Sequence, residues 1–251
     1  MAFQLEAREA IVMYRYVMPF PVPPGTSDEA VQGGGVYFRA HPAEYAESRR
    51  RAGVTLERAY LQKTPTGSGV VTYVEGERPF AETFGALLDP ALELNRWFTD
   101  FLVKVHGLDP AQAASAPPPE TIGDWSDPAV MERKRGLAFT APIMPGMDDA
   151  GRALATAAFV TRAAELAASR RALHQNREVV TLQATPMGSF VSVYLEGDDP
   201  VTGNREFAAS QSPYDVWFKT ELAKLVPPGI DFNESLPPIT EIFDSTQYLG
   251  G

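Results

Sequence analysis

The chain of 251 residues has no cysteine, only three histidines, and fewer basic than acidic side chains. The lack of cysteine excludes a disulfide framework, a thiolate metal site and a cysteine nucleophile, and it fits a reducing compartment. With 22 Lys and Arg against 32 Asp and Glu, the net charge is −10. Because such a surface would not neutralise phosphates, we expect no nucleic-acid partner and no binding to anionic membranes.

Long hydrophobic runs are also missing. No apolar run approaches the ~18 residues of a membrane-spanning helix, and the first ten residues lack the basic-then-apolar pattern of a secretory signal. We therefore expect a cytoplasmic protein that does not contact a membrane. Hydrophobic residues make up 44% of the chain, which is enough for a buried core in one large domain or two small ones.

The sequence contains an internal repeat. A shift of 121 positions aligns residues 38–76 with residues 159–197, and 18 of the 39 aligned pairs are identical. Only about two or three identities are expected at ordinary residue frequencies. With a one-residue gap the match continues through a Trp-Phe pair to a Pro-Pro tail in each half. This duplication predicts two domains, 1–128 and 129–251.

Each half is predicted to form six elements in the same order. An apolar strand and a helix are followed by two strands around a Thr-Pro-x-Gly-Ser hairpin, an amphipathic helix and a short closing strand. The expected ranges are 11–18, 42–52, 57–64, 70–75, 94–105 and 120–125, and then 136–144, 153–173, 178–185, 191–196, 214–225 and 240–244. The order β-α-β-β-α-β is that of the ferredoxin-like unit. One such unit leaves a sheet face bare, so we predict an α+β fold of two ferredoxin-like βαββαβ repeats packed sheet to sheet as a pseudo-symmetric barrel.

Besides the order of elements, several short motifs resemble those of a known protein family. In the first half they are Ser48-Arg49-Arg50, Glu57-Arg58, Leu61-Gln62, Thr64-Pro65, Gly67, Glu75, Trp97-Phe98 and Pro117-Pro118. The chain resembles a fused, two-copy member of the dimeric α+β barrel superfamily, and each half is similar to a family of short, uncharacterised bacterial proteins. The second half departs from the pattern, with Val179 in place of Arg58. The resemblance covers almost the whole chain and implies a self-contained barrel, which could still form a higher oligomer. The superfamily includes cofactor-free monooxygenases, isomerases and haem enzymes, so it implies no single activity.

Strand alternation places polar side chains on one face of each central hairpin. They include Arg58, Tyr60, Gln62, Tyr73 and Glu75 in the first half and Gln183, Tyr194 and Glu196 in the second. In one interpretation they form a ligand pocket, in which Glu75 is a catalytic base, Tyr73 a proton donor and the others bind the ligand. In the other, they hydrogen-bond across the contact between the sheets, because buried polar atoms need partners.

Arg15 is a third catalytic candidate, because it stands among apolar residues on the first strand. Alternation groups it with Met13 and Val17, and we match it to Ala141 in the second half. If this face meets the helices, the buried guanidinium needs an acidic partner or an anionic ligand. The superfamily resemblance implies a small-molecule site between sheet and helices, where Arg15 would anchor a carboxylate or enolate. A simple ion pair is the alternative.

The histidines argue against a metal or haem site. His41, His106 and His174 have no histidine at the matching position of the other half, and their spacing is not that of metal ligands. Trp97 and His106 would lie ~180° apart around a helix, which disfavours haem binding through His106. We expect no cofactor and no metal. Trp97 and Phe98 are expected to be core residues that would form the wall of any pocket.

The glycine run at 33–35 lacks the pattern of a phosphate-binding loop. We expect the segment 21–35 to be a flexible insertion that covers the first half as a lid.

The two halves have diverged at several positions. Arg15, Arg58, Tyr60 and His106 of the first half are matched to Ala141, Val179, Thr181 and Val226. This favours a single small-molecule pocket in the first repeat. We favour a cofactor-independent enzyme of the monooxygenase, isomerase or lyase type that acts on an apolar, partly anionic molecule. A non-catalytic ligand-binding module and a structural or interaction module are the alternatives, and haem binding is less favoured.

Overall fold

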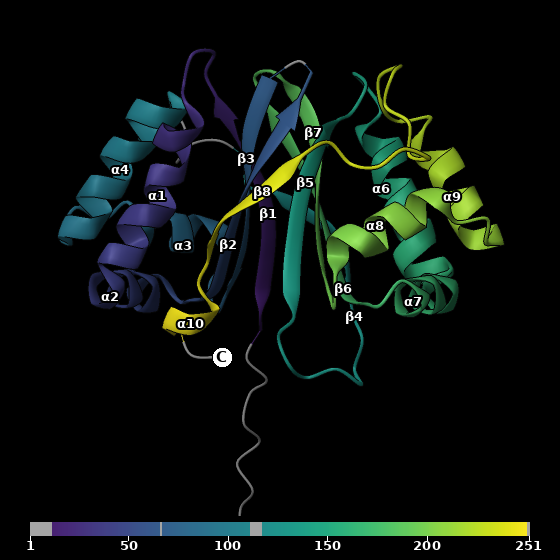
Figure 1. The fold of residues 1–251 in the computed structure, drawn as a ribbon, viewed down its shortest axis with the longest axis horizontal. Coiled ribbons are helices and arrows are strands. Elements are labelled where there is room, and N and C mark those ends of the chain that lie inside the picture. The colour runs from purple at the N-terminus through teal and green to yellow at the C-terminus, as the bar shows by residue number, and fades with distance from the viewer. Residues whose placement is uncertain (1–11, 66, 111–116, 250–251) are drawn as a thin grey trace, which may run out of the picture.

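The computed structural model describes residues 12–65, 67–110 and 117–249. They form two four-stranded antiparallel sheets that face each other, with helices on the two outer sides (Figure 1). The predicted α+β barrel of two sheets is therefore confirmed. Of the helices within these ranges, none has the length and apolar character needed to span a membrane.

The first sheet has the strand order β1-β3-β2-β8. Its strands are β1 (Tyr14–Val22), β2 (Val54–Thr64), β3 (Gly67–Gly76) and β8 (Ile239–Asp244), and its helices are α1 (Asp28–Ala40), α2 (Pro42–Ala52), α3 (Phe80–Leu87) and α4 (Glu93–His106). Ile11, where the first strand was expected to begin, lies outside the described residues. Helix α4 ends at Gly107, whose φ of 63° lies in the left-handed region that favours glycine. That turn places His106 as the last residue of the helix.

The second sheet has the order β4-β6-β7-β5. Its strands are β4 (Glu120–Ser126), β5 (Arg135–Pro142), β6 (Gln175–Thr185) and β7 (Gly188–Gly197). The helices on its outer side are α6 (Asp148–Thr156), the π-helical η1 (Ala157–Thr161), α7 (Ala163–Ala172), α8 (Pro200–Ala209) and α9 (Pro213–Leu222). A last short helix, α10 (Thr246–Leu249), returns to the first sheet and packs on α2 and β2.

The two repeats exchange their closing strands. Strand β4 follows the helices of the first repeat but pairs with β6, and β8, drawn in yellow in Figure 1, pairs with β2. The sequence predicts these strands, but not the sheet that each one joins. Neither 1–128 nor 129–251 therefore contains all the strands of one sheet.

The expectation of a flexible lid at 21–35 is wrong, because most of this segment is helical. Ser27 caps α1 by accepting a hydrogen bond of 3.1 Å from the main-chain N–H of Ala30. The glycines lie inside α1, where two of them, Gly34 and Gly35, allow close packing. A Cβ atom on Gly34 would lie 3.0 Å from Cζ of Phe101 in α4, so the lack of a side chain there lets the two helices approach.

The contact between the sheets has a core of its own. Its buried residues are Val17, Leu56, Tyr60, Val71, Tyr73, Ala138, Val179 and Tyr194. At its centre the equivalent rings of Tyr73 and Tyr194 stack with their centroids 3.5 Å apart and their planes 4° apart. The barrel interior is therefore packed with side chains, and the remaining hydrophobic clusters lie between each sheet and its helices.

Candidate functional site

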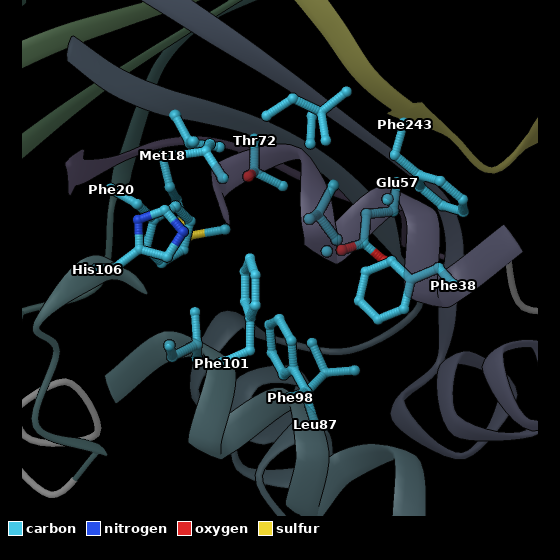
Figure 2. Close-up of a pocket in the computed structure, with 18 of the residues that line it drawn as sticks. Met18, Phe20, Phe38, Glu57, Thr72, Leu87, Phe98, Phe101, His106 and Phe243 are labelled. Carbon is cyan, nitrogen blue, oxygen red and sulfur yellow. The ribbon is translucent and has the colours of Figure 1, made fainter. Parts of the chain in front are cut away.

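A cavity of about 70 Å³ lies between the first sheet and helices α1, α3 and α4 (Figure 2). Aromatic and aliphatic side chains form most of its wall, among them Met18, Phe20, Phe38, Phe98, Phe101 and Phe243. At ~30 Å³ per water it has room for about two water molecules. Because pockets for drug-sized ligands measure roughly 300–1,000 Å³, a ligand with several rings requires side chains to move.

Three polar side chains, those of Glu57, Thr72 and His106, reach the cavity. His106 lies at one end and Glu57 at the other, with the Thr72 hydroxyl directed inward between them (Figure 2). No hydrogen bond from the Thr72 side chain is found to the described residues. In the second repeat the positions of Thr72 and His106 hold Val193 and Val226, so this polar pair belongs to the first repeat alone.

The His106 ring is held in one orientation. The side chain is only 4% exposed, and its Nδ1 lies 2.8 Å from the carbonyl oxygen of Pro21. Because a carbonyl only accepts, Nδ1 carries the proton, and Nε2 of the neutral ring is left as an acceptor. Nε2 has no hydrogen-bond partner among the described residues and points toward the cavity (Figure 2).

The surroundings of His106 keep its ring neutral. Burial lowers its pKa below the ordinary value of 6.5, although the hydrogen bond to Pro21 acts in the opposite direction. The rings of Phe20 and Phe101 lie beside it, with centroids 5.8 and 5.6 Å away. At pH 7 the cavity therefore contains a neutral imidazole with a free basic nitrogen.

Glu57, at the far end of the cavity, belongs to a structural ion pair. Its Oε2 accepts hydrogen bonds of 2.7 Å from Arg49 Nε and 2.8 Å from the Tyr45 hydroxyl. The equivalent Arg170 Nε and Glu178 Oε2 of the second repeat lie 2.6 Å apart. Because the pair recurs in both repeats, we assign it to the scaffold that joins the helices to the sheet.

The polar row predicted from strand alternation lies between the two sheets. Gln62 shows the pattern: its Nε2 donates to the Thr140 carbonyl at 3.0 Å, and its Oε1 accepts from the Thr140 N–H at 2.8 Å. In the first repeat the residue equivalent to Thr140 is Pro19, which has no N–H to donate to the counterpart Gln183. The Oε1 of Gln183 is accordingly buried without a partner among the described residues.

Glu75 accepts hydrogen bonds from three arginines. The donors are Nη1 of Arg133 at 3.0 Å, Nη2 of Arg133, Nε of Arg15 at 3.4 Å and Nη1 of Arg177, and the Tyr73 hydroxyl is a fifth. Burial by itself would raise the pKa of Glu75, but Arg133 and Arg177 outweigh it and lower the pKa to about 2. A carboxyl group with this pKa stays ionised and is a poor base at neutral pH.

Glu196 occupies the equivalent place in the second repeat with different partners. It accepts from the Tyr194 hydroxyl at 2.8 Å, from Arg58 Nη1 at 3.2 Å and from Asn176 Nδ2 at 3.3 Å. Arg58 Nε also lies 2.8 Å from Asp244. Burial raises the pKa of Tyr194 well above 10, so its phenol stays protonated and donates to Glu196. These contacts match the interpretation in which the polar row forms hydrogen bonds across the contact between the sheets. A ligand-binding role for these residues, including the buried Tyr60, stays a prediction.

Arg15 faces the opposite sheet, so the expectation that it faces the helices is wrong. Val17, on the same side of β1, belongs to the core between the sheets, whereas Tyr16 packs on the helix side. Arg15 Nη1 pairs with Asp124 of β4 at 2.8 Å, in addition to Glu75. The observed contacts of Arg15 are those of an ion pair, which was the alternative to a role in binding an anionic ligand.

The match of Arg15 to Ala141 is also wrong. Arg15 lies opposite Glu75, and the residue opposite Glu196 is Gly136. A Cβ atom on Gly136 would lie 2.7 Å from Nη1 of Arg58. In the second repeat, Arg58 from the facing sheet therefore occupies the space next to the glutamate.

Trp97 and Phe98, which were both predicted to form the wall of a pocket, have different surroundings. Phe98 lines the cavity. Trp97 does not, because it turns to the seam between α1 and α4, where its ring stacks on Tyr37 with a centroid distance of 3.7 Å. Of the predicted site residues, Phe98 alone lines this cavity. Sequence reasoning missed His106 as a site residue, because its partner Pro21 is 85 positions away; the divergence from Val226 was the only signal.

Comparison with known proteins defines the fold but no family. No family model matches the chain. Over 111 residues the chain is 32% identical to "Endoglucanase 24" from Oryza sativa subsp. japonica, a match that covers 43% of this chain and 21% of that protein. The chain thus spans about one fifth of the length of this curated relative. Glycoside hydrolysis uses a pair of carboxyl groups, whereas Glu57 is the only carboxylate that the described residues contribute to the cavity wall.

Solved structures align along nearly the whole chain. One described as an anthrone oxidase-like protein aligns with a TM-score of 0.50 at 12% identity, covering 93% of this chain and 94% of that chain. Candidate monooxygenases from Lactobacillus acidophilus NCFM and Fusobacterium nucleatum subsp. nucleatum align with TM-scores of 0.48 and 0.44, at 10% and 8% identity. They cover 92% and 93% of this chain, and 95% and 91% of their own. This chain has the fold of a tandem-duplicated dimeric α+β barrel.

Proposed function

We propose that the cavity of the first repeat binds an apolar, ring-containing small molecule, and that His106 removes a proton from it to start an oxidation by dioxygen. The observation that carries the proposal is the His106 ring, whose Nδ1 is fixed by Pro21 and whose Nε2, unpartnered among the described residues, faces a mostly apolar cavity. A base of this kind must be neutral at working pH, and burial keeps it so.

The reaction follows from what such a base can do. Nε2 accepts a proton from a C–H next to a carbonyl group, and the resulting enolate is the electron-rich species that dioxygen oxidises. For a methylene group the balance is R₂CH₂ + O₂ → R₂C=O + H₂O, so the substrate supplies all four electrons. The Thr72 hydroxyl is available to donate to the enolate oxygen.

The position of His106 favours the charge that develops on it. It is the last residue of α4, where the helix dipole stabilises an imidazolium. The Pro21 carbonyl, which accepts from Nδ1, stabilises the same cation. These two effects lower the cost of proton transfer without charging the resting ring.

The wall of the cavity supports a flat, ring-containing ligand. Phe38, Phe98 and Phe101 offer ring faces and edges for stacking. Phe101 is half-buried and stacks on Trp97 with a centroid distance of 5.2 Å. Rotation of Phe101 is thus the simplest way to enlarge the cavity.

Anthrone is the first substrate to test, because it is a ring ketone with an acidic methylene group and because the anthrone oxidase-like protein shares the fold. Without added cofactor, the protein should accelerate oxygen uptake and the formation of anthraquinone. His106→Gln should lower kcat by about 10²–10⁴-fold, the range for loss of a general base. The matched control is His41→Gln, because Nδ1 of His41 also contacts a carbonyl oxygen, that of Tyr37 at 2.9 Å, but outside the cavity.

Each outcome bears on the proposal. Equal rates for the wild type and His106→Gln would remove His106 from the reaction. Saturable binding of anthrone without oxygen uptake would favour the non-catalytic ligand-binding module. The absence of both binding and turnover would contradict the choice of substrate and of the oxidase reaction.

A further inference from the structure

A second pocket, of about 370 Å³, opens at one end of the contact between the sheets. Its lining residues come from β1 and the residue before it, from β2 and β3, from α10 and from the connection between β4 and β5. Figure 1 shows α10 and that connection at the same end of the sheets. Arg15, Glu75 and Arg133 form its polar wall, and Met13 and Leu56 add an apolar side. Its volume falls within the range of roughly 300–1,000 Å³ for small-molecule sites.

The arginines of this pocket have donors to spare. Each guanidinium carries five N–H groups. Arg133 uses Nη1 and Nη2 to bind Glu75, and its Nε has no hydrogen-bond partner among the described residues. Arg15 uses Nε and Nη1 for Glu75 and Asp124, which leaves its Nη2 without a partner in the same ranges. The two side chains are 22% and 27% exposed, so their free donors reach the pocket and solvent.

The charge around Glu75 is unbalanced. Arg15, Arg133 and Arg177 share this one carboxylate. Among the described residues, the only further acids within ion-pair distance of these arginines are Asp124 and, at 3.9 Å from Arg133, Glu196. Glu196 itself is held mainly by Arg58. The wall formed by Arg15, Arg133 and Glu75 therefore carries one excess positive charge, in a protein whose net charge is −10.

We propose that this pocket is a second ligand site, distinct from the His106 cavity, and that it binds a small carboxylate with a short apolar body. The carboxylate accepts hydrogen bonds from Arg15 Nη2 and Arg133 Nε, and the apolar body packs on Met13 and Leu56. Charge-assisted bonds from guanidinium to carboxylate are among the strongest hydrogen bonds in proteins. The inference rests on this pocket alone and does not depend on the proposed oxidation.

Benzoate is a suitable probe, with benzamide as its neutral counterpart. Calorimetric titration of the full chain should show one benzoate site at constant ionic strength and no binding of benzamide. Arg133→Gln should raise the dissociation constant of benzoate at least tenfold. Arg152→Gln, which removes an arginine that pairs with Glu120 and Asp149 on the surface, should change it less than twofold.

Glu75 keeps Arg15 and Arg177 as partners in Arg133→Gln, so this variant should fold. If it does not, Arg15→Gln makes the same test from the other side of the pocket and should also raise the dissociation constant at least tenfold. The proposal would be overturned if benzoate failed to bind the wild type, if benzamide bound equally well, or if a folded arginine variant bound benzoate as tightly as the wild type.

Discussion

At the scale of single residues, the side chains with the most unusual surroundings lie in two separate places. His106 stands in a mostly apolar cavity with one nitrogen that has no partner among the described residues, and Glu75 is enclosed by arginines between the sheets. The first arrangement leaves the Nε2 atom of His106 accessible from the cavity. In the second, the carboxylate oxygens of Glu75 already accept hydrogen bonds from arginines. We therefore assign proton transfer to His106 and sheet-to-sheet cohesion to Glu75.

The pH dependence of the oxidation follows from the state of His106. The ring must be neutral to accept a proton, so activity should be constant at high pH and fall as pH drops through its pKa. Because burial lowers that pKa below 6.5, kcat/KM for anthrone should already be level at pH 7. It should fall tenfold per pH unit well below the midpoint. A midpoint above 6.5 in a pH–rate profile would contradict this assignment.

Loss of the Glu75 carboxylate should destabilise the fold. Glu75→Gln leaves three arginines without their shared acid, and breaking such buried pairs costs roughly 3–5 kcal/mol. The matched control is Glu47→Gln, since Glu47 pairs with Arg50 and Arg51 on the surface of α2, where ion pairs add little to stability. Urea unfolding at pH 7 measures both. Equal losses would show that the Glu75 cluster is no stronger than a surface pair.

Acid should weaken the same cluster. The pKa of Glu75 falls from 4.5 to about 2 on folding, so its ionised form contributes stability that is fully present above pH 4.5. That contribution, on the order of 3 kcal/mol, should be lost as pH falls from 4.5 toward 2. Urea unfolding should show a smaller pH dependence over this range for Glu75→Gln than for the wild type. An unchanged dependence would contradict the assignment.

For single residues, the sequence predicts which side chains share a face of a strand better than it predicts what that face contacts. Alternation correctly places Arg15 with Val17, but it does not say which side of β1 meets the helices. The partner that fixes His106 is Pro21, on a distant element. Contacts of this kind depend on packing, so no local spacing reveals them.

At the scale of elements, helix α1 sets the size of the cavity. A Cβ atom on Gly34 would lie 3.0 Å from Cζ of the Phe101 ring, whereas a Cβ atom on the neighbouring Gly33 would have nothing within 4 Å. Of the three glycines in the run, only Gly34 would meet Phe101 if it carried a Cβ atom, whereas Gly35 would meet Ile242. Sequence reasoning placed this run in a flexible insertion, whereas the structure places it inside α1.

Two alanine substitutions in α1 separate these effects. Gly33→Ala should raise the free energy of unfolding by about 0.5–1 kcal/mol through helix propensity and leave KM for anthrone unchanged. Gly34→Ala should push Phe101 toward the cavity and raise KM at least tenfold while the protein stays folded. Urea unfolding and steady-state kinetics measure the two quantities. An unchanged KM in Gly34→Ala would show that Phe101 does not control access to the cavity.

At the scale of the whole molecule, the repeats are joined by the exchange of β4 and β8. The duplication and the order of elements predict the barrel, because both can be recognised from short segments of the sequence. The exchange is not predictable in this way, since the order of elements is the same whichever sheet a closing strand joins. In the sequence, prolines come directly before both closing strands.

Separate expression of the two halves tests this exchange. Fragment 1–128 lacks β8 and fragment 129–251 lacks β4, so each alone should fail to form a stable monomer with a complete sheet. Coexpressed, they should form a one-to-one complex with the secondary structure of the intact chain. Size-exclusion chromatography and circular dichroism would show both results. A stable monomeric fragment 1–128 with native-like unfolding would contradict the exchange.

The central claim is that Nε2 of His106 is an unprotonated nitrogen in a ligand cavity, and ¹⁵N-histidine NMR tests it directly. The chain has only three histidines, so the variants His41→Gln and His174→Gln assign the His106 signals. At pH 7, Nδ1 of His106 should be protonated and Nε2 unprotonated, and anthraquinone, the expected product, should shift the Nε2 resonance while His41 and His174 stay unchanged. A protonated Nε2, or a resonance that saturating anthraquinone leaves in place, would contradict the account.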